Sequence, residues 1–195
     1  MVLAFLSPVA LYLYGSTLLP ANRDPEDPAR VPPIARTLLW RELGGKAPPK
    51  LPVLNPYTHF TEPDGPGMSL AVGAGRRLLR DEVPQRRWKL VFFASVVWTS
   101  RHWSTDEALS TIRARAYYGH GFYGLDAAAQ GYFGVTATSL SAFETAQLVV
   151  LTRSASRFDP WCKTESNQKR AAELAGQSGS LQVTRLQRAP EGACR

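Results

Sequence analysis

Helix signals dominate the second half of the chain, and they constrain its fold more than any other feature. Two capping boxes, at 104–107 and 141–144, each place a serine three residues before a glutamate, just ahead of an apolar helical pattern. The second box predicts a helix over 142–151, an apolar helix is predicted over about 125–133, and a last, polar helix is predicted over about 165–174. Strand signals are few, so the predicted fold class is mainly α.

A continuous apolar run, Leu90 to Trp98 (LVFFASVVW), precedes the first capping box. Such a run fits either a buried helix or a buried strand, and its helical neighbours favour a helix. It is too short to span a membrane, which takes about 20 residues. We therefore expect a buried helix here.

The first twenty residues, MVLAFLSPVALYLYGSTLLP, contain no charged side chain. At about 1.5 Å per residue, a helix of this length nearly matches a hydrocarbon core of roughly 30 Å. A cleaved signal peptide is the alternative, but it usually has a basic start and a small-x-small cleavage site, and neither is found. We therefore predict one uncleaved N-terminal transmembrane helix.

Residues 20–66 are rich in proline, which favours extended structure and turns. One amphipathic piece, Ile34 to Leu43, interrupts it and is predicted to be helical. The predicted organisation is an anchor at 1–20, a Pro-rich linker with the start of the domain at 21–66, a main domain at 67–174 and a tail at 175–195.

The net charge of +7 and the sequence pI of about 9.7 fit three kinds of partner: nucleic acid, an anionic membrane or a phosphate-bearing ligand. No zinc-finger, K-homology or RNA-recognition pattern is present, so we expect no nucleic-acid partner. Cys162 and Cys194 form no C-x-x-C pair, so no metal site is predicted. They are either two unrelated thiols or one disulfide that ties the tail to the domain in an oxidising compartment.

The segment from Tyr117 to Pro160 resembles the second half of the family 51 glycosyltransferases, which polymerise lipid II in bifunctional penicillin-binding proteins and monofunctional transglycosylases. The same register extends back through Trp103 to Arg115 and then to Lys89. The positions that carry the resemblance are Tyr117, Gly119, Gly121, Tyr123, Gly124, Ala127 to Gln130, Tyr132, Phe133, Gly134, Leu140, Glu144, Ser156, Arg157, Asp159 and Pro160. Further upstream, Gly67, Ser69, Leu70 and Arg76 also fall on family positions.

The resemblance implies a lysozyme-like glycosyltransferase domain. Its reaction joins a sugar hydroxyl to the anomeric carbon of a lipid-linked sugar, and a lipid pyrophosphate leaves. Such chemistry needs a general base and cationic groups, or a divalent cation such as Mg or Mn, to take up charge on the pyrophosphate. The implied partners are lipid II or nascent glycan, membrane lipid and other cell-wall synthesis proteins. The implied location is the bacterial cytoplasmic membrane, single-pass, with the domain on the periplasmic or extracellular side.

The resemblance also suggests site residues. Glu42 is the candidate catalytic base, with an exposed glutamate at the end of a helix as the alternative. The candidate substrate-binding residues are Ser69, Arg76, Lys89, Arg115 and His120. For the basic residues the alternative is a solvated charged face, and for His120 it is a structural role in a glycine-rich loop.

The chain departs from the family pattern where that pattern has its acids. Phe92 takes the place of a carboxylate, and Val72 and Gly73 take the places of two glutamines. A phenylalanine can neither accept a proton nor orient a hydroxyl. Three functions therefore stay open: an active lipid II glycosyltransferase, an impaired member that binds glycan or acts as a scaffold, and a lysozyme-like hydrolase. The aromatic residues Tyr117, Tyr123, Tyr132 and Phe133 are expected in the core.

Overall fold

The computed structural model describes residues 7–30, 32–61, 63–79, 85–176 and 184–194. The chain forms two compact units. Unit 1 comprises Met1–Pro28 and Leu43–Ile112, and unit 2 comprises Ala29–Glu42 and Arg113–Arg195. Each unit is built from two separate stretches of chain. The regular secondary structure of the described residues is helical, apart from one isolated β-bridge between Tyr117 and Tyr123. The prediction of a mainly α fold is therefore confirmed.

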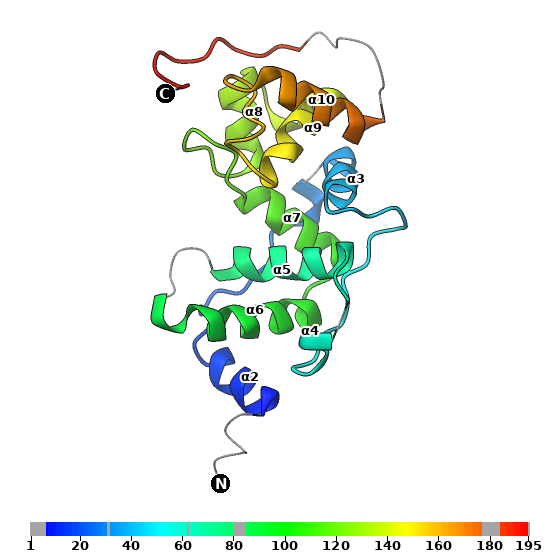
Figure 1. The fold of residues 1–195 in the computed structure, drawn as a ribbon, viewed down its shortest axis with the longest axis vertical. Helices are drawn as coiled ribbons and strands as arrows, with labels where there is room; N and C mark the ends of the chain where they lie inside the picture. Colours follow the sequence, from blue (N-terminus) through cyan, green and yellow to red (C-terminus); the bar gives the residue numbers. More distant parts are fainter. Residues whose placement is uncertain (1–6, 31, 62, 80–84, 177–183, 195) are drawn as a thin grey trace. The chain divides into compact units, whose positions relative to one another are not determined.

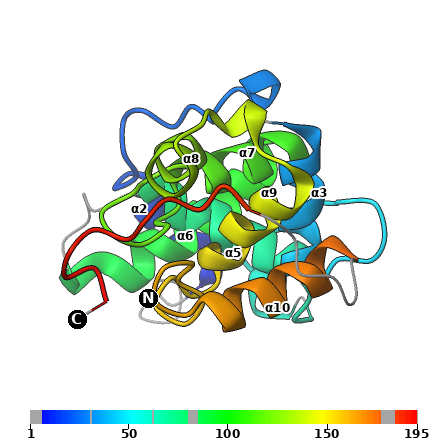
Figure 2. The ribbon, with the colours of Figure 1, turned by 90° about the horizontal axis from the view of Figure 1, so that it is seen from above.

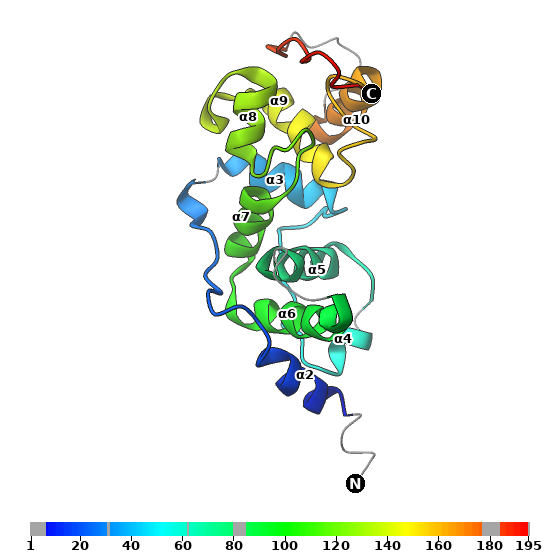
Figure 3. The same cartoon turned by 90° about the vertical axis from the view of Figure 1, so that its left-hand side faces the viewer.

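In unit 1, helix α6 lies between α5 and α2 (Figures 1 and 3). The elements of this unit are α2 (Pro8–Ser16), α4 (Thr58–Thr61), α5 (Pro66–Leu79), η2 (Gln85–Arg87), α6 (Trp88–His102) and most of α7 (Thr105–Arg115). The last residues of α7 are assigned to unit 2, and the short helix η1 (Pro28–Arg30) contains the point where the chain passes from unit 1 to unit 2. The apolar run predicted as a helix is the middle of α6, and its buried residues include Val91, Ala94, Val96 and Val97.

Two glycines let the helices of unit 1 approach each other closely. A Cβ on Gly75 of α5 would lie 2.8 Å from the backbone nitrogen of Val96, and a Cβ on Gly15 of α2 would lie 2.8 Å from the Cβ of Ala94. Since such distances are too short for real side chains, both positions need glycine. The glycines on α2 and α5 therefore let both helices pack closely on α6.

The first helix of the described residues, α2, is shorter than the predicted anchor at 1–20. Helix α2 has nine residues, about 14 Å at the rise of an α-helix, and no helix among the described residues is long and apolar enough to cross a membrane. The predicted transmembrane helix over 1–20 is thus not found in the described residues, and 1–6 lie outside them. Helix α2 begins at Pro8, which is favourable in a first helical turn. At the C-terminal end of the helix, the hydroxyl of Ser16 donates to the carbonyl of Leu13 and the hydroxyl of Thr17 donates to the carbonyl of Tyr14.

Unit 2 is organised around α9, which packs against α3, α8 and α10. Its elements are α3 (Pro33–Glu42), α8 (Leu125–Phe133), η3 (Ala137–Ser139), α9 (Ala142–Val149), η4 (Val150–Thr152) and α10 (Thr164–Ala175). Its core contains the fully buried side chains of Tyr118, Leu125, Tyr132, Leu148 and Leu151. The predicted helices over 125–133, 142–151 and 165–174 are confirmed, the second of them ending as η4.

Both capping boxes are formed. Ser104 and Ser141 each accept a hydrogen bond from the backbone N–H of the glutamate three residues on, and each glutamate accepts one from the serine's own N–H. Two backbone N–H groups at each helix start, which would otherwise lack a partner, are satisfied in this way.

The prediction that the tyrosines lie in the core holds only in part, since Tyr132 is buried whereas Tyr117 and Tyr123 are exposed.

The C-terminal segment 184–194, drawn in red in Figure 2, packs on unit 2. Gln187 N donates to the carbonyl of Tyr132, and the indole N–H of Trp161 donates to the carbonyl of Gln187. Leu186 packs against the core. A disulfide between Cys162 and Cys194 closes the segment onto the unit, so of the two alternatives for the cysteines the disulfide is the one formed.

Candidate functional site

Unit 2 contains a pocket of about 380 Å³ between the segment that follows η4 and helix α10. Its lining is strongly cationic, with three arginines and one lysine against one glutamate. The lining residues are Arg153, Arg157, Phe158, Ser166, Lys169, Arg170 and Glu173. Such a concentration of positive charge favours an anionic ligand.

Glu42, the predicted base, lies beside this pocket at the C-terminal end of α3. Its side chain is 3% exposed, and its carboxylate pairs with Arg170 at 2.9 Å and with Arg153 at 3.6 Å. A buried carboxylate needs such partners, and it lies at the helix end where the helix dipole disfavours negative charge. Glu42 is therefore not the exposed glutamate of the alternative interpretation, but a buried acid held by two pocket arginines.

Hydrogen-bonding capacity remains in this cluster. Among the described residues, neither Glu42 Oε1 nor Arg170 Nε has a hydrogen-bond partner, and both atoms are buried. A buried polar atom without a hydrogen-bond partner is energetically unfavourable. A hydrogen bond from either of these two atoms to a polar group of a ligand in the pocket would therefore be stabilising. Arg170 is further held by Glu173, three residues later on α10, at 3.1 Å.

The other predicted site residues divide between the units. Ser69 and Arg76 of α5 and Lys89 of α6 are exposed in unit 1. Arg115 and His120 belong to unit 2 and are partly buried. A joint site made of all six residues therefore stays a prediction.

Phe92, which replaces the family's carboxylate, lies one turn after Trp88 on α6, and the two rings stack with centroids 5.7 Å apart. It is half-buried and engaged with its aromatic neighbour. This position thus supplies packing and no acid.

His120 lies in the glycine-rich hairpin between α7 and α8. Its Nε2 is 2.5 Å from Asp159 Oδ2, and its φ of 49° is positive, which a residue with a side chain rarely adopts. The structural alternative for His120 is thus supported by a specific contact, while its predicted role in substrate binding stays untested.

Glu144 matches the family pattern and is buried, at 2% exposure. Its carboxylate binds Arg185 of the C-terminal segment, with Nε to Oε1 at 2.9 Å and Nη2 to Oε2 at 2.5 Å. Hydrogen bonds from Arg185 and from Ser141 outweigh the effect of burial and lower the pKa of Glu144 from 4.5 to about 2. This glutamate therefore joins α9 to the tail rather than serving as an acid.

The lowered pKa of Glu144 makes stability depend on pH. Because the folded-state pKa lies below the unfolded one, its contribution is fully present above about pH 4.5 and is lost as the pH falls toward 2. Because the partner Arg185 is half-exposed and solvent screens its charge, we expect the ionised Glu144 to contribute about 1–2 kcal/mol to the free energy of unfolding. Glu144→Gln should lower the free energy of unfolding at pH 7 by about this amount, and by about half of it at pH 3, as measured by urea denaturation. Glu107→Gln, in the other capping box, should retain the acid dependence of the wild type; an equal change in both variants would contradict the assignment.

Four of the pocket residues were missed from the sequence: Arg153, Arg157, Lys169 and Arg170. Their signal was weak, because Arg153 and Arg157 precede the Asp159-Pro160 turn while Lys169 and Arg170 lie in a polar helix. Four cations within eighteen residues resemble an ordinary solvated face. Only the packing of α10 beside the segment after η4 shows that they surround one pocket.

Comparison with known proteins bears on the family. Residues 76–178, just over half of the chain, match the transglycosylase family. The chain is 28% identical to penicillin-binding protein 2D of Bacillus subtilis over 114 residues, which are 58% of this chain and 16% of that protein. It is 31% identical to the biosynthetic peptidoglycan transglycosylase of Vibrio parahaemolyticus over 84 residues, 43% of this chain and 37% of that protein. The chain thus spans well under half the length of these relatives. The mainly α fold and the family match agree with the resemblance in the sequence, and the chain belongs to the transglycosylase family.

Proposed function

We propose that this chain is a peptidoglycan glycosyltransferase-like protein of cell-wall biosynthesis that binds lipid II, or nascent glycan, at the membrane surface. The observation that carries the proposal is the cationic pocket beside Glu42. Family membership suggests a lipid-linked glycan, and the pyrophosphate is the part of that ligand that a cluster of arginines would recognise.

The pocket suits a pyrophosphate through its side chains. Guanidinium groups form paired hydrogen bonds with phosphate oxygens, and Arg157 and Lys169 are exposed and extend the positive charge to the rim. A bound Mg or Mn ion does not fit this lining, because such ions take oxygen ligands and only Glu173 among the charged lining residues offers a carboxylate. The charge of the ligand would thus be met by the four cations.

Catalytic turnover has weaker support than binding. A base must take a proton from the attacking hydroxyl, and the Glu42 carboxylate is buried and already engaged by two arginines. Phe92 supplies no second acid. Removal of a positioned acid or base typically lowers rates by about 10²–10⁴-fold. We therefore propose the impaired, glycan-binding form of the family function ahead of the active one.

One observation favours the active glycosyltransferase as the second candidate. Glu42 Oε1 is a buried acceptor without a hydrogen bond among the described residues, which leaves it available to a sugar hydroxyl. On this second proposal, Glu42 would be the general base of transfer.

We also propose that unit 1 meets the membrane on the extracytoplasmic side. Leu13 and Tyr14 of α2 are 58% and 54% exposed, and Phe60 of α4 is 64% exposed. The same unit carries exposed basic residues, such as Arg86 and Lys89, which would attract anionic lipid. The disulfide fits an oxidising compartment. Other cell-wall synthesis proteins are the partners we expect there.

The pocket can be tested by charge reversal. Lys169→Glu should weaken binding of fluorescent lipid II to the purified protein about tenfold or more at low salt, because it turns a pocket cation into an anion facing the pyrophosphate. The matched control is Lys163→Glu, an exposed lysine that precedes α10 and does not line the pocket. Equal binding by both variants would refute the pocket assignment.

Turnover is tested in parallel with labelled lipid II and gel analysis of glycan polymer. We expect the wild type to bind lipid II and to form little or no polymer. Polymer formation that Glu42→Gln abolishes, with lipid II binding retained, would reject the impaired form and establish the active one.

A further inference from the structure

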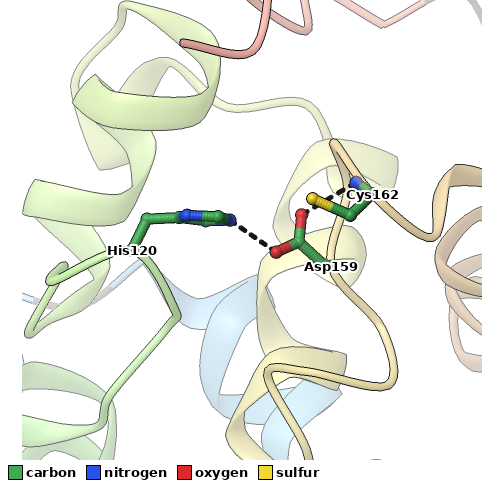
Figure 4. A group of neighbouring side chains, drawn as sticks. All are labelled: His120, Asp159 and Cys162. Carbon is green, nitrogen blue, oxygen red and sulfur yellow. Dashed lines mark hydrogen bonds and ion pairs between the residues drawn. The ribbon is translucent and has the colours of Figure 1, made fainter. Parts of the chain in front are cut away.

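Three side chains that can bind metals converge at the edge of unit 2 (Figure 4). One ligand atom from each of His120, Asp159 and Cys162 lies within 4.8 Å of the other two. His120 and Asp159 are already in contact, and their side chains are 21% and 10% exposed. The cluster therefore lies near the surface, where an ion from solvent can reach it.

The backbone holds these residues in place. Asp159 Oδ1 accepts hydrogen bonds from the N–H groups of Trp161 at 2.8 Å and Cys162 at 3.1 Å, which leaves Oδ2 directed at His120. The hairpin that carries His120 is closed by hydrogen bonds between Tyr118 and Phe122 and between Phe122 and Gly119. Among the described residues, His120 is the one non-glycine residue with positive φ. A strained backbone that is fixed from several sides is a common feature of ligand sites.

The third ligand is blocked by the tail. Cys162 is bonded to Cys194, and a disulfide sulfur is not the thiolate that metal ions bind. Cys194 belongs to the segment that Arg185 and Gln187 fasten to unit 2 by hydrogen bonds. Loss of the disulfide thus frees the Cys162 sulfur while these other contacts still hold the tail nearby.

We propose that reduction of the Cys162–Cys194 disulfide creates a site for a divalent metal ion of the zinc type, bound by His120 Nε2, Asp159 Oδ2 and Cys162 Sγ, with water as the fourth ligand. A dithiol reductant supplies two electrons and two protons, so the disulfide becomes two thiols and the dithiol becomes a disulfide. The Cys162 thiol then gives its proton to solvent as its sulfur binds the ion.

The ligand types and spacing point to zinc rather than magnesium or calcium. Nitrogen and sulfur ligands select zinc-like ions, whereas magnesium and calcium take oxygen. In a tetrahedral site with bonds of 2.0–2.3 Å, ligand atoms lie about 3.4 Å apart. His120 and Asp159 would therefore separate slightly from 2.5 Å, and the freed sulfur would move inward.

The test uses two variants that lose the same disulfide but free different thiols. Cys194→Ser leaves the Cys162 thiol beside His120, whereas Cys162→Ser leaves Cys194 on the tail. With Cys194→Ser we expect one equivalent of Zn²⁺ per chain in calorimetry and thiolate-to-metal charge-transfer absorption with Co²⁺. Cys162→Ser should show neither, and the oxidised wild type should bind no stoichiometric metal.

Adding His120→Ala to Cys194→Ser should weaken Zn²⁺ binding at least tenfold. Should Cys194→Ser fail to fold by circular dichroism, the folded wild type reduced by a phosphine serves in its place, with His120→Ala as its control. Equal metal binding by the two cysteine variants, or none by folded Cys194→Ser, would overturn the proposal. Neither readout involves lipid II, so the result is independent of the proposed function.

Discussion

Gly124→Ala is expected to lower the free energy of unfolding of unit 2 by about 2–5 kcal/mol. Two penalties add at this position. The φ of Gly124 is +88°, which costs a residue with a Cβ about 1–2 kcal/mol, and the new Cβ would lie 2.6 Å from the carbonyl oxygen of Ala114. Overpacking of this kind typically costs about 1–3 kcal/mol more. Chemical denaturation followed by circular dichroism would measure the change.

Gly121→Ala is the matched control. Gly121 lies in the same hairpin with a φ of +81°, but among the described residues no atom beyond its chain neighbours lies within 4 Å of the position its Cβ would take. It should therefore show the backbone penalty alone, about 1–2 kcal/mol. If the two variants were equally stable, close packing of Gly124 against Ala114 would not be what requires glycine there.

Loss of the disulfide is expected to have an effect of similar size. Cys162 and Cys194 are 32 residues apart in sequence, and closing a loop of that length stabilises a fold by about 3–4 kcal/mol through the unfolded state. Without added metal, Cys162→Ser and Cys194→Ser should lower the melting temperature equally, because they open the same loop. Differential scanning calorimetry of the two variants and the oxidised wild type would measure this.

The stabilities of these two variants should separate when Zn²⁺ is added. A metal ion that binds only the folded state raises its stability. Only Cys194→Ser should gain, since it alone keeps the Cys162 thiol beside His120. A large difference between the variants before metal is added would mean that Cys162 has packing interactions of its own, beyond the loop closure.

Local signals in the sequence predicted the helices well. The capping boxes at Ser104 and Ser141 and the apolar run within α6 lie where the sequence placed them, because caps and short-range periodicity depend on neighbours in the chain. The family match likewise depends on a contiguous stretch. These features need no knowledge of tertiary contacts.

Features that depend on distant contacts were not predictable. The partners of Glu42 are Arg153 and Arg170, more than a hundred residues away, and nothing near Glu42 in the sequence indicates them. Tyr117 and Tyr123 were expected in the core, yet the hairpin turns both outward while Tyr118 between them is buried. Successive side chains in extended backbone point to opposite sides, so the pairing of Tyr117 with Tyr123 decides which tyrosines face the core. The glycine-rich sequence does not show which residues pair.

The tail was also underestimated. The sequence predicted a tail at 175–195 and gave a disulfide as one of two alternatives, but it did not indicate that segment 184–194 also supplies the partner of Glu144. Both contacts join residues at least thirty positions apart. A polar composition therefore did not distinguish a free tail from one whose few specific contacts fasten it to a unit.

The assignment of α3 to unit 2 has a consequence during protein synthesis. The ribosome completes α3 before most of unit 1, yet the helix that α3 packs against, α9, emerges about a hundred residues later. At typical elongation rates this interval is roughly 5–20 s. Throughout that time the apolar face of α3, with Leu38, Leu39 and Ala35, lacks α9, while the later part of unit 1 is being made. The contact between α3 and α9 that helps to build unit 2 therefore cannot form until α9 has left the exit tunnel.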